Sequence, residues 1–321
     1  MKAYNLGIVR SLIMLKKNDV LTLGDLCVDL IMIDDDIIPE FGQKEKLINN
    51  YSLEMGGSCS IFACQLGKLG VKTAIVGTVG NDQFGELILS CLNHSGVTLD
   101  YVKKDINIKT GLSLALTNGN DRAILTYNGT IDAVTIEDVS DELLNSVRHL
   151  HIGSYFLMKK MQHFYRDIIL KLKENGATIS LDTNWDPEEK WGSGLWDILP
   201  LIDVFLPNEN EIMAITKTNN IGDAIEKLIN IIPIIAVKKG KDGAVVYTKN
   251  NKYYGSAINV KKVDSIGAGD SFDAGFLYGY LSGKELQQCV QIGCICGSLN
   301  TRMAGGTRSQ PTFEELTSYL K

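Results

Sequence analysis

The segment of the chain with the clearest chemical potential is VDSIGAGDSFDAGF, residues 263–276. Phe272 and Phe276 lie four residues apart, which predicts a helix that begins at about residue 269. The first N–H groups of a helix lack intrahelical partners and form a site for an anion. A carboxylate at that point, here Asp270, can accept a proton from an attacking hydroxyl while the N–H groups take up charge on a transferred phosphoryl group. The residues predicted to do this chemistry are Asp270 and the three small residues before it, Gly267, Ala268 and Gly269.

The same residues also suit a plain helix start. In that interpretation, Asp270 only complements the helix dipole and the glycines only make a turn. This segment supports both interpretations equally, and the choice between them depends on motifs elsewhere in the chain.

Two motifs make the chain resemble a known family. Residues 264–270, DSIGAGD, resemble the C-terminal signature of the ribokinase-like (PfkB-type) carbohydrate kinases, and residues 72–85, KTAIVGTVGNDQFG, resemble their N-terminal signature. Further matches run from about residue 21 to residue 315. The resemblance implies an α/β fold, a ribokinase-like three-layer sandwich with a mostly parallel central sheet and a small β lid.

The resemblance also implies a domain organisation. Residues 1–17 are expected to form an N-terminal extension, and residues 18–321 a single kinase domain. The lid strands are expected as insertions at about 30–54 and 108–131. The second insertion contains two alternating strands around an Asn- and Gly-rich turn, which is typical of a hairpin.

The acceptor site is expected near the first strand. Residues 20–31, VLTLGDLCVDLI, predict a strand whose carboxyl end faces a ligand. The resemblance implies that Asp29 binds sugar hydroxyls and that Gly56 and Gly57 line the sugar site. A loop Asp and a glycine turn before a helix are the simpler alternatives. Ile61 stands where family members commonly have Asn, so the usual pattern of hydroxyl recognition is not expected here.

A second acidic segment, FLPNENE at 205–211, predicts a metal site. Asn208 and Glu211 are three residues apart and share a face of a starting helix. Such a face can hold hydrated Mg²⁺ against ATP phosphates, because Mg²⁺ keeps several waters and uses one or two carboxylates. Favourable acids at a helix N-terminus are the alternative. The family's Asn-x-x-Glu motif favours the metal, with Asn208 and Glu211 as its ligands.

Other nucleotide-binding residues follow from the resemblance. Asp186 occupies the position of a phosphate-binding Arg in the family, so a phosphate contact there is left to Asn184. The residues implied to bind the nucleotide are Asn184, Asn208, Glu211, Lys238, Gly240, Gly243 and Asn300.

Composition restricts the partners. The net charge of −6 gives no basic footprint for nucleic acid, and no run approaches the roughly 18 apolar residues of a membrane span. The seven cysteines are scattered, which is typical of reduced thiols and favours the cytoplasm.

The sequence thus predicts an ATP-dependent kinase that phosphorylates a hydroxyl of a small ribose-, fructose- or ketodeoxysugar-like carbohydrate. The cofactors are ATP and Mg²⁺, and the resemblance also admits a monovalent cation such as K⁺. The partners are sugar and ATP, with a homodimer through the lid as a further hypothesis. Two alternatives stay open: a nucleoside kinase of the same fold, and a catalytically silent regulator that binds sugar or nucleotide.

Overall fold

The computed structural model describes residues 17–34, 37–118 and 121–320. All but the last residue of the expected N-terminal extension therefore lies outside the described part of the chain. The strands are β1 (Val20–Leu23), β2 (Cys27–Asp34), β3 (Asn50–Gly56), β4 (Thr73–Gly80), β5 (Val102–Asp105), β6 (Gly111–Asn118), β7 (Asp121–Tyr127), β8 (His149–Ile152), β9 (Thr178–Leu181), β10 (Val204–Phe205), β11 (Ile234–Lys238), β12 (Ala244–Tyr247) and β13 (Lys252–Gly255). The α-helices are α2 (Ser58–Lys68), α3 (Gln83–His94), α4 (Asp141–Asn145), α5 (Lys159–Gln162), α6 (Tyr165–Glu174), α7 (Leu195–Ile198), α8 (Glu209–Thr216), α9 (Ile221–Leu228), α10 (Ala268–Leu281), α11 (Leu286–Asn300) and α12 (Phe313–Tyr319).

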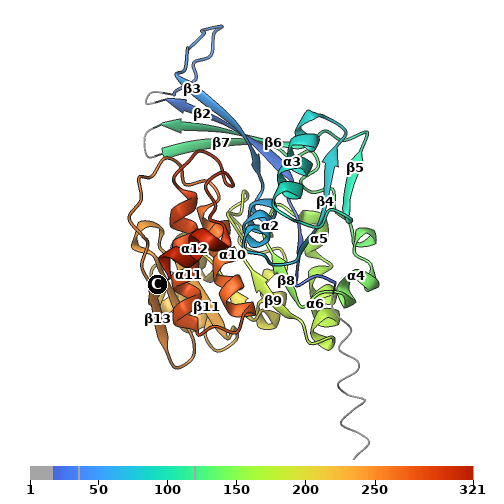
Figure 1. Cartoon of the computed structure of the whole chain (residues 1–321), viewed down its shortest axis with the longest axis vertical. Coiled ribbons are helices and arrows are strands. Elements are labelled where there is room, and N and C mark those ends of the chain that lie inside the picture. The colour runs from blue at the N-terminus through green and yellow to red at the C-terminus, as the bar shows by residue number, and fades with distance from the viewer. Residues whose placement is uncertain (1–16, 35–36, 119–120, 321) are drawn as a thin grey trace, which may run out of the picture.

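Among the described residues, nine strands form the main sheet in the order β13-β12-β11-β10-β9-β8-β1-β4-β5. All neighbours from β11 to β5 are parallel, and only the β11-β12 and β12-β13 pairs are antiparallel. The prediction of a mostly parallel central sheet is therefore confirmed. Parallel neighbouring strands need crossover connections, which are usually helices, and helices cover both faces of this sheet (Figure 1).

The two faces of the main sheet bury separate hydrophobic clusters, as β1 illustrates. Leu21 and Leu23 belong to a buried cluster that includes residues of α6, α8 and α9, whereas Val20 belongs to one that includes residues of α2, α10 and α11. Successive strand residues point to opposite faces, so a fully buried run such as this one is expected in the middle layer of three. The three-layer sandwich is confirmed.

A second, small sheet has the order β3-β2-β6-β7 and lies across one end of the main body, at the top of Figure 1. The hairpin predicted in the second insertion is present, because β6 and β7 pair antiparallel. The small sheet is built from the two segments expected to form the lid, although β2 begins at Cys27, before the expected boundary.

The expectation of one first strand over residues 20–31 is wrong. β1 ends at Leu23, β2 begins at Cys27, and the two strands belong to different sheets. The break has a packing cause. A Cβ on Gly24 would lie 2.2 Å from the Cβ of Cys59, so only glycine allows this approach to α2. Asp25 then accepts the backbone N–H groups of Ser58 and Cys59, each at 2.9 Å, which draws the chain to the start of α2.

Candidate active site

The start of α10 has the geometry expected of an anion site. Gly267 precedes the helix at φ 72°, and no described side chain caps the first turn. A Cβ on Gly267 would lie 2.6 Å from the Cα of Gly306, so glycine is needed for both the left-handed backbone and the close approach. The N–H of Ala268 donates to the carbonyl of Ser265 at 3.3 Å, so the other N–H groups of the first turn and the positive end of the helix dipole are available to a ligand.

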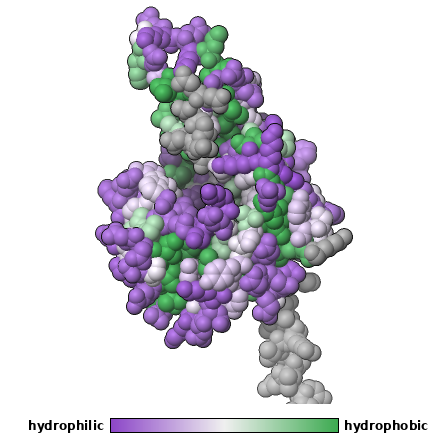
Figure 2. Space-filling model, turned by 90° about the vertical axis from the view of Figure 1, so that its left-hand side faces the viewer, coloured by the Kyte–Doolittle hydropathy of each residue, from purple (hydrophilic) through white to green (hydrophobic). Residues whose placement is uncertain are grey.

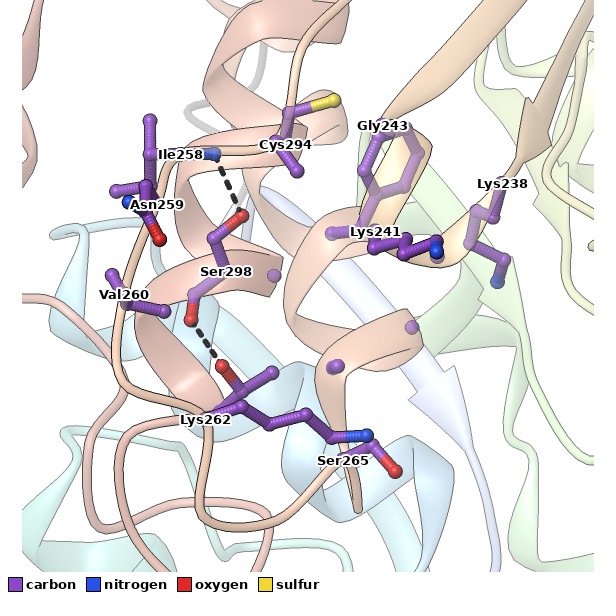
Figure 3. A pocket seen from close by; sticks show the side chains of 17 residues that line it. Lys238, Lys241, Gly243, Ile258, Asn259, Val260, Lys262, Ser265, Cys294 and Ser298 are labelled. Atoms are coloured by element: carbon purple, nitrogen blue, oxygen red, sulfur yellow. Dashed lines mark hydrogen bonds between the residues drawn. The ribbon is translucent and has the colours of Figure 1, made fainter. Parts of the chain in front are cut away.

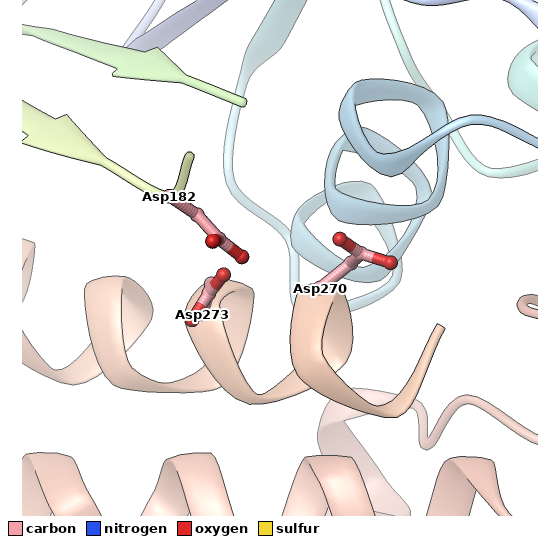
Figure 4. Close-up of side chains that lie close together, drawn as sticks. All are labelled: Asp182, Asp270 and Asp273. Atoms are coloured by element: carbon pink, nitrogen blue, oxygen red, sulfur yellow. The ribbon is translucent and has the colours of Figure 1, made fainter. Parts of the chain in front are cut away.

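Asp270 lies half-buried on the first turn of α10. Figure 4 shows its carboxylate turned toward the light-blue helix, α2, with Asp182 and Asp273 nearby. Oxygen atoms of the three carboxylates lie within 4.8 Å of one another. Burial, with a further contribution from the charge of Asp182, raises the pKa of Asp270 to about 7. A carboxylate with this pKa is suited to accept a proton near neutral pH.

A buried lysine balances the charge of this acidic group. Lys238 Nζ lies 2.7 Å from Asp182 Oδ2 and 3.1 Å from Asp273 Oδ2, and the side chains are 12%, 5% and 0% exposed. Burial alone would lower the pKa of Lys238, but the neighbouring carboxylates raise it. Burial alone would raise the pKa of Asp182, but Lys238 lowers it, whereas burial leaves the pKa of Asp273 raised. The three-carboxylate arrangement thus already contains a cation, the Lys238 ammonium.

A pocket of about 460 Å³ opens beside the start of α10 (Figure 3). One wall is largely apolar and comes from the segment before α10 and from α11, where Ser298 Oγ accepts the backbone N–H of Ile258 at 3.2 Å. The other end has lysines, glycines and the first residues of α10. The lining residues are Lys238, Gly240, Lys241, Gly243, Ala257, Ile258, Asn259, Val260, Lys262, Ser265, Ala268, Gly269, Phe272, Cys294, Gly297, Ser298 and Thr301. An apolar end and a cationic, N–H-rich end suit a purine nucleotide.

The pocket contains several residues that the sequence singled out, namely Lys238, Gly240, Gly243, Ala268 and Gly269. It also contains residues that sequence reasoning missed, above all the segment 257–262 and the α11 residues. The segment 257–262 has no motif and reaches the pocket only through tertiary folding. On α11 the spacing of Cys294, Gly297, Ser298 and Thr301 is that of one helix face, which is the signal that was available.

The structure places Asn300 elsewhere. Asn300 lies on a different face of α11 from the described residues that line the pocket, and its side chain is fully buried. Its Nδ2 donates to the carbonyl of Ile266 at 2.8 Å, which fastens the loop before Gly267. This geometry supports a role in positioning that loop and gives no support to a direct contact with the nucleotide.

Asn208 and Glu211 form a reciprocal cap at the start of α8. Glu211 N donates to Asn208 Oδ1 and Asn208 N donates to Glu211 Oε2, both at 2.9 Å. Burial first, and then the charge of Asp182, raises the pKa of Glu211 to about 7. The cap matches the structural alternative for these two residues. A cation would nevertheless relieve the unfavourable charge of buried Glu211, and the carboxylate and amide oxygens suit Mg²⁺.

Asn184 connects several of these groups. Its backbone N–H donates to Asp182 Oδ1 at 3.1 Å and its φ is 54°. With the amide oriented so that both ends are satisfied, Nδ2 donates to Asp182 Oδ2 at 3.1 Å and Oδ1 accepts from the Ser58 hydroxyl. Asp186, in contrast, accepts backbone N–H groups of its own loop, including that of Trp191 at 2.7 Å, so it organises that loop.

The residues expected at the acceptor site lie where the small sheet meets α2. Asp29 on β2 lies opposite Glu54 on β3 in the register of the two strands. A Cβ on Gly56 would lie 2.2 Å from Asp29 Oδ1. Gly57 precedes α2 at φ 87°, and a Cβ there would lie 1.9 Å from the carbonyl oxygen of Asp25. The backbone therefore requires glycine at position 57, whereas at position 56 glycine leaves room for the Asp29 side chain. Ser58, the next residue, connects this turn to Asn184.

Ile61 has a structural role in place of the family's usual amide. A Cβ on Gly306 would lie 2.3 Å from Ile61 Cδ1, and one on Gly267 would lie 2.9 Å from Ile61 Cγ2. The isoleucine therefore packs against the loop that forms the anion site.

Comparisons with known proteins define the class of enzyme. The family model described as pfkB family carbohydrate kinase matches residues 17–313. An ATP-dependent ribose-1-phosphate kinase from Halopiger xanaduensis is 28% identical over 305 residues, which cover 94% of this chain and 97% of that protein. A 2-dehydro-3-deoxygluconokinase from Bacillus subtilis is 30% identical over 288 residues, which cover 85% and 88% of the two chains.

Solved structures show the same fold. The Arabidopsis thaliana ribokinase complexed with ribose and ATP has a TM-score of 0.79 at 22% identity, over 95% of this chain and 99% of that one. A protein from E. coli solved with ATP and Mg²⁺ has a TM-score of 0.83 at 24% identity, over 94% and 99%. The fold and site thus define a phosphotransferase with an alcohol group as acceptor. The chain belongs to the pfkB family of carbohydrate kinases.

Proposed function

We propose that this protein transfers the γ-phosphoryl group of Mg·ATP to a hydroxyl of a small sugar. One observation carries the proposal: a half-buried carboxylate with a pKa of about 7, Asp270, stands on an uncapped helix start beside the nucleotide-sized pocket. A base and an anion site at the same helix end are the two components that phosphoryl transfer to an alcohol requires.

In the proposed reaction Asp270 accepts the proton of the attacking hydroxyl. The new bond forms between that oxygen and the γ-phosphorus, the bond from the γ-phosphorus to the bridging oxygen breaks, and ADP leaves with the electron pair. The backbone N–H groups at Gly267, Gly269 and Asp270 stabilise the charge on the transferred group, and that of Ala268 is shared with the Ser265 carbonyl. Removing the proton as the bond forms keeps positive charge from building up on the attacking oxygen.

The acceptor is proposed to lie between the small sheet and the start of α2. Asp29 would bind sugar hydroxyls, since a carboxylate can accept hydrogen bonds from two hydroxyl groups. Gly56 and Gly57 bring backbone close to the sugar without side chains in the way.

The proposed Mg²⁺ shell consists of Asn208 and Glu211, with water as the remaining ligands. When bound, Mg²⁺ neutralises phosphate charge and orients the ATP phosphates. Asn184 and Lys238 both form hydrogen bonds with Asp182. The contacts of Lys238 with two carboxylates suggest that it acts on the phosphates as a fixed charge near Gly269.

A monovalent cation is a separate proposal, at the loop before α10. Asp264 Oδ1 and Oδ2 accept backbone N–H groups of Ile266 and Gly305, at 3.1 Å and 2.9 Å, and so join two loops. Asn300 Oδ1 is buried and has no hydrogen-bond partner among the described residues. An oxygen left in this state fits a cation ligand. Activity in K⁺, compared with Na⁺ and a bulky organic cation at equal ionic strength, tests this proposal.

A homodimer through the small sheet is also proposed. On the face of the small sheet that turns away from Asp29 the residues are mostly apolar, and several are exposed or half-buried. Figure 2, which has the small sheet at the top, shows green apolar residues there among purple hydrophilic ones. The apolar residues of this face are Leu30, Met32, Tyr51, Leu53, Leu112, Leu114, Leu116, Ala123, Leu125 and Tyr127. A large exposed apolar face is unusual for a monomer, and an aspartate at Leu125, 64% exposed, should dissociate the dimer in sedimentation without unfolding it.

We further propose that the protein acts in the cytoplasm, because its seven cysteines are unpaired and six of them are buried. No helix in the described part of the chain has the length and apolar composition of a membrane span. Residues 18–321 are proposed to act as one kinase domain.

The proposed function is tested with a panel of neutral sugars, sugar acids, sugar phosphates and nucleosides, each assayed for ADP release with Mg·ATP. Acceptor-dependent ADP release with a sugar supports the proposal. A response confined to nucleosides would assign the same chemistry to a nucleoside kinase. Binding of sugar and ATP without any ADP release would identify a silent regulator.

A further inference from the structure

A buried glutamine near the end of the chain joins two helices of the candidate site. Gln310, 5% exposed, lies in the segment between α11 and α12. Its Nε2 donates to the carbonyl of Ile61 on α2 at 2.8 Å and to the hydroxyl oxygen of Ser271 on α10 at 3.1 Å. An amide nitrogen has two protons, so both hydrogen bonds form at the same time. One amide group therefore bridges α2 and α10.

Both hydrogen bonds are made where a helix begins. Ile61 and Ser271 close the first turns of their helices, because their backbone N–H groups donate to the carbonyls of Gly57 and Gly267, each at 2.9 Å. Gly57 belongs to the turn proposed to line the sugar, and Gly267 belongs to the anion site. Ser271 also follows Asp270 directly in the sequence. The bridge thus joins the helix start at the proposed acceptor site to the helix start that has the general base.

The bridge is part of a closely packed arrangement. A Cβ on Gly267 would lie 2.9 Å from Ile61 Cγ2, so the start of α10 is in direct contact with α2. The residue before Gln310 attaches the segment to α11 as well, because Ser309 Oγ donates to the carbonyl of Asn300 at 2.6 Å. The Gln310 amide is therefore presented from a fixed backbone.

A directional bond adds something that the apolar contact of these helices lacks. Apolar contact opposes the separation of two helices and has no preferred direction, whereas a hydrogen bond weakens steeply when its angle changes. Ser271 is 0% exposed, so water cannot easily replace the Gln310 amide at its hydroxyl. The amide thus opposes rotation of α10 about its axis as well as its displacement from α2.

We propose that Gln310 is a positioning residue for phosphoryl transfer: through Ser271, its amide fixes the first turn of α10, with Asp270 and the anion site, against the start of α2. The proposal rests on the proposed function, in which Asp270 accepts the proton of a sugar bound near α2. It assigns Gln310 no contact with sugar or nucleotide. Because a misplacement of about 1 Å can lower a rate about 100-fold, loss of the bridge acts on kcat.

The test compares Gln310→Met, which keeps an unbranched side chain and removes the amide, with Ser271→Ala, which removes only the partner on α10. We expect each variant to lower kcat about 10–100-fold. ADP has no γ-phosphoryl group to place at the start of α10, so its affinity, measured by calorimetry, should stay within about twofold of the wild type. The double variant should have a kcat within about twofold of that of Gln310→Met, because both changes break the same bond.

Gln65→Met is a matched control. Gln65 on α2 is 0% exposed, and its Nε2 donates to the carbonyl of Pro311, the residue after Gln310, at 2.9 Å. In both glutamines the amide oxygen has no hydrogen-bond partner among the described residues, so the two substitutions remove similar groups. The Gln65 bond attaches the same segment to α2 without involving α10. Gln65→Met should therefore lower the melting temperature about as much as Gln310→Met and leave kcat within about twofold of the wild type.

Three results would overturn the proposal and leave the proposed function intact. One is an equal kcat for the folded Gln310→Met and Gln65→Met variants. Another is a pair of losses, in Gln310→Met and Ser271→Ala, that multiply in the double variant, which would mean that the two residues do not act through their common bond. The third is a loss of ADP affinity as large as the loss of kcat, which would assign the effect to the nucleotide pocket.

The outcome does not depend on the folding of Gln310→Met. Ser271→Ala places a strong helix former in α10, so this variant is expected to fold, and a wild-type kcat for it would overturn the proposal by itself. Failure of the proposed function is a different result, because the wild-type protein would then release no acceptor-dependent ADP.

Discussion

Replacement of Lys238 by Met tests the charge balance beneath the nucleotide pocket. The lysine is 12% exposed and its partners Asp182 and Asp273 are 5% and 0% exposed, so water can replace little of what the ammonium supplies. Removing one partner of a buried ion pair costs about 3–5 kcal/mol, because the remaining charge stays buried and uncompensated. At about 2–4 °C per kcal/mol, the melting temperature should fall by roughly 6–20 °C.

The assay is thermal unfolding of Lys238→Met beside a surface control. Lys171→Met removes an ion pair to Asp141 whose side chains are 40% and 74% exposed, and it should cost at most about 1 kcal/mol. The double variant of Lys238→Met with Asp182→Asn should be less destabilised than the sum of its single variants by about 1–3 kcal/mol.

The pH dependence of this effect has a definite sign. In the wild type, Lys238 keeps the folded pKa of Asp182 below its unfolded value, so that stabilisation is present above the unfolded pKa and lost as the pH falls through the folded pKa. Without Lys238, burial is expected to raise that pKa above the unfolded value, and the variant should gain stability as the pH falls. The difference in melting temperature between the wild type and Lys238→Met should therefore be smaller at pH 5 than at pH 8. Equal melting of the Lys238→Met and Lys171→Met variants, or strict additivity in the double variant, would refute the reasoning.

Three further predictions concern activity. Because Asp270 must be ionised to accept a proton and its pKa is raised to about 7, kcat/KM should rise with pH with a midpoint near 7. A midpoint near 4 would show that burial and the charge of Asp182 do not raise this pKa. Gly267→Ala should lower kcat about 100-fold through displacement of the anion site, while Gly283→Ala, at the same φ of 72° but with no atom within 4 Å of its Cβ, should leave kcat unchanged. Glu211→Gln keeps the cap of α8 and should raise the Mg²⁺ concentration needed for half-maximal ADP release at least tenfold, whereas the control Glu209→Gln should not change it. The same Mg²⁺ dependence in both variants would mean that Glu211 does not bind the metal.

The layers of the fold were predictable because they follow from local patterns. Buried strands alternating with helices predict a parallel sheet, and the alternating hairpin after Thr110 predicted β6 and β7. The division of residues 20–31 between two sheets was not predictable, because no local signal separates Leu23 from Cys27. The break arises from the approach of Gly24 to Cys59, a contact between residues 35 positions apart.

The candidate site shows the same division between local and tertiary information. Small residues and an acid at a predicted helix start point to the first turn of α10, and the structure places Gly269 in the pocket and the neighbouring Asp270 half-buried with a raised pKa. The ion pairs of Lys238 with Asp182 and Asp273 were not predicted from the sequence, because the three residues come from separate parts of the chain that only the fold brings together. The place of Asn300 was missed for a simpler reason, since a position in a motif does not say which face of a helix a side chain occupies.

The central claim is that Asp270 removes the proton from the acceptor, and the measurement that tests it most directly is acceptor-dependent ADP release by Asp270→Asn. Asparagine keeps the shape of the side chain and cannot accept the proton. The account predicts that kcat falls by about 10²–10⁴-fold, while the affinity for ATP, measured separately by calorimetry, stays within a few-fold of the wild type. Turnover by Asp270→Asn at a rate near that of the wild type would contradict it.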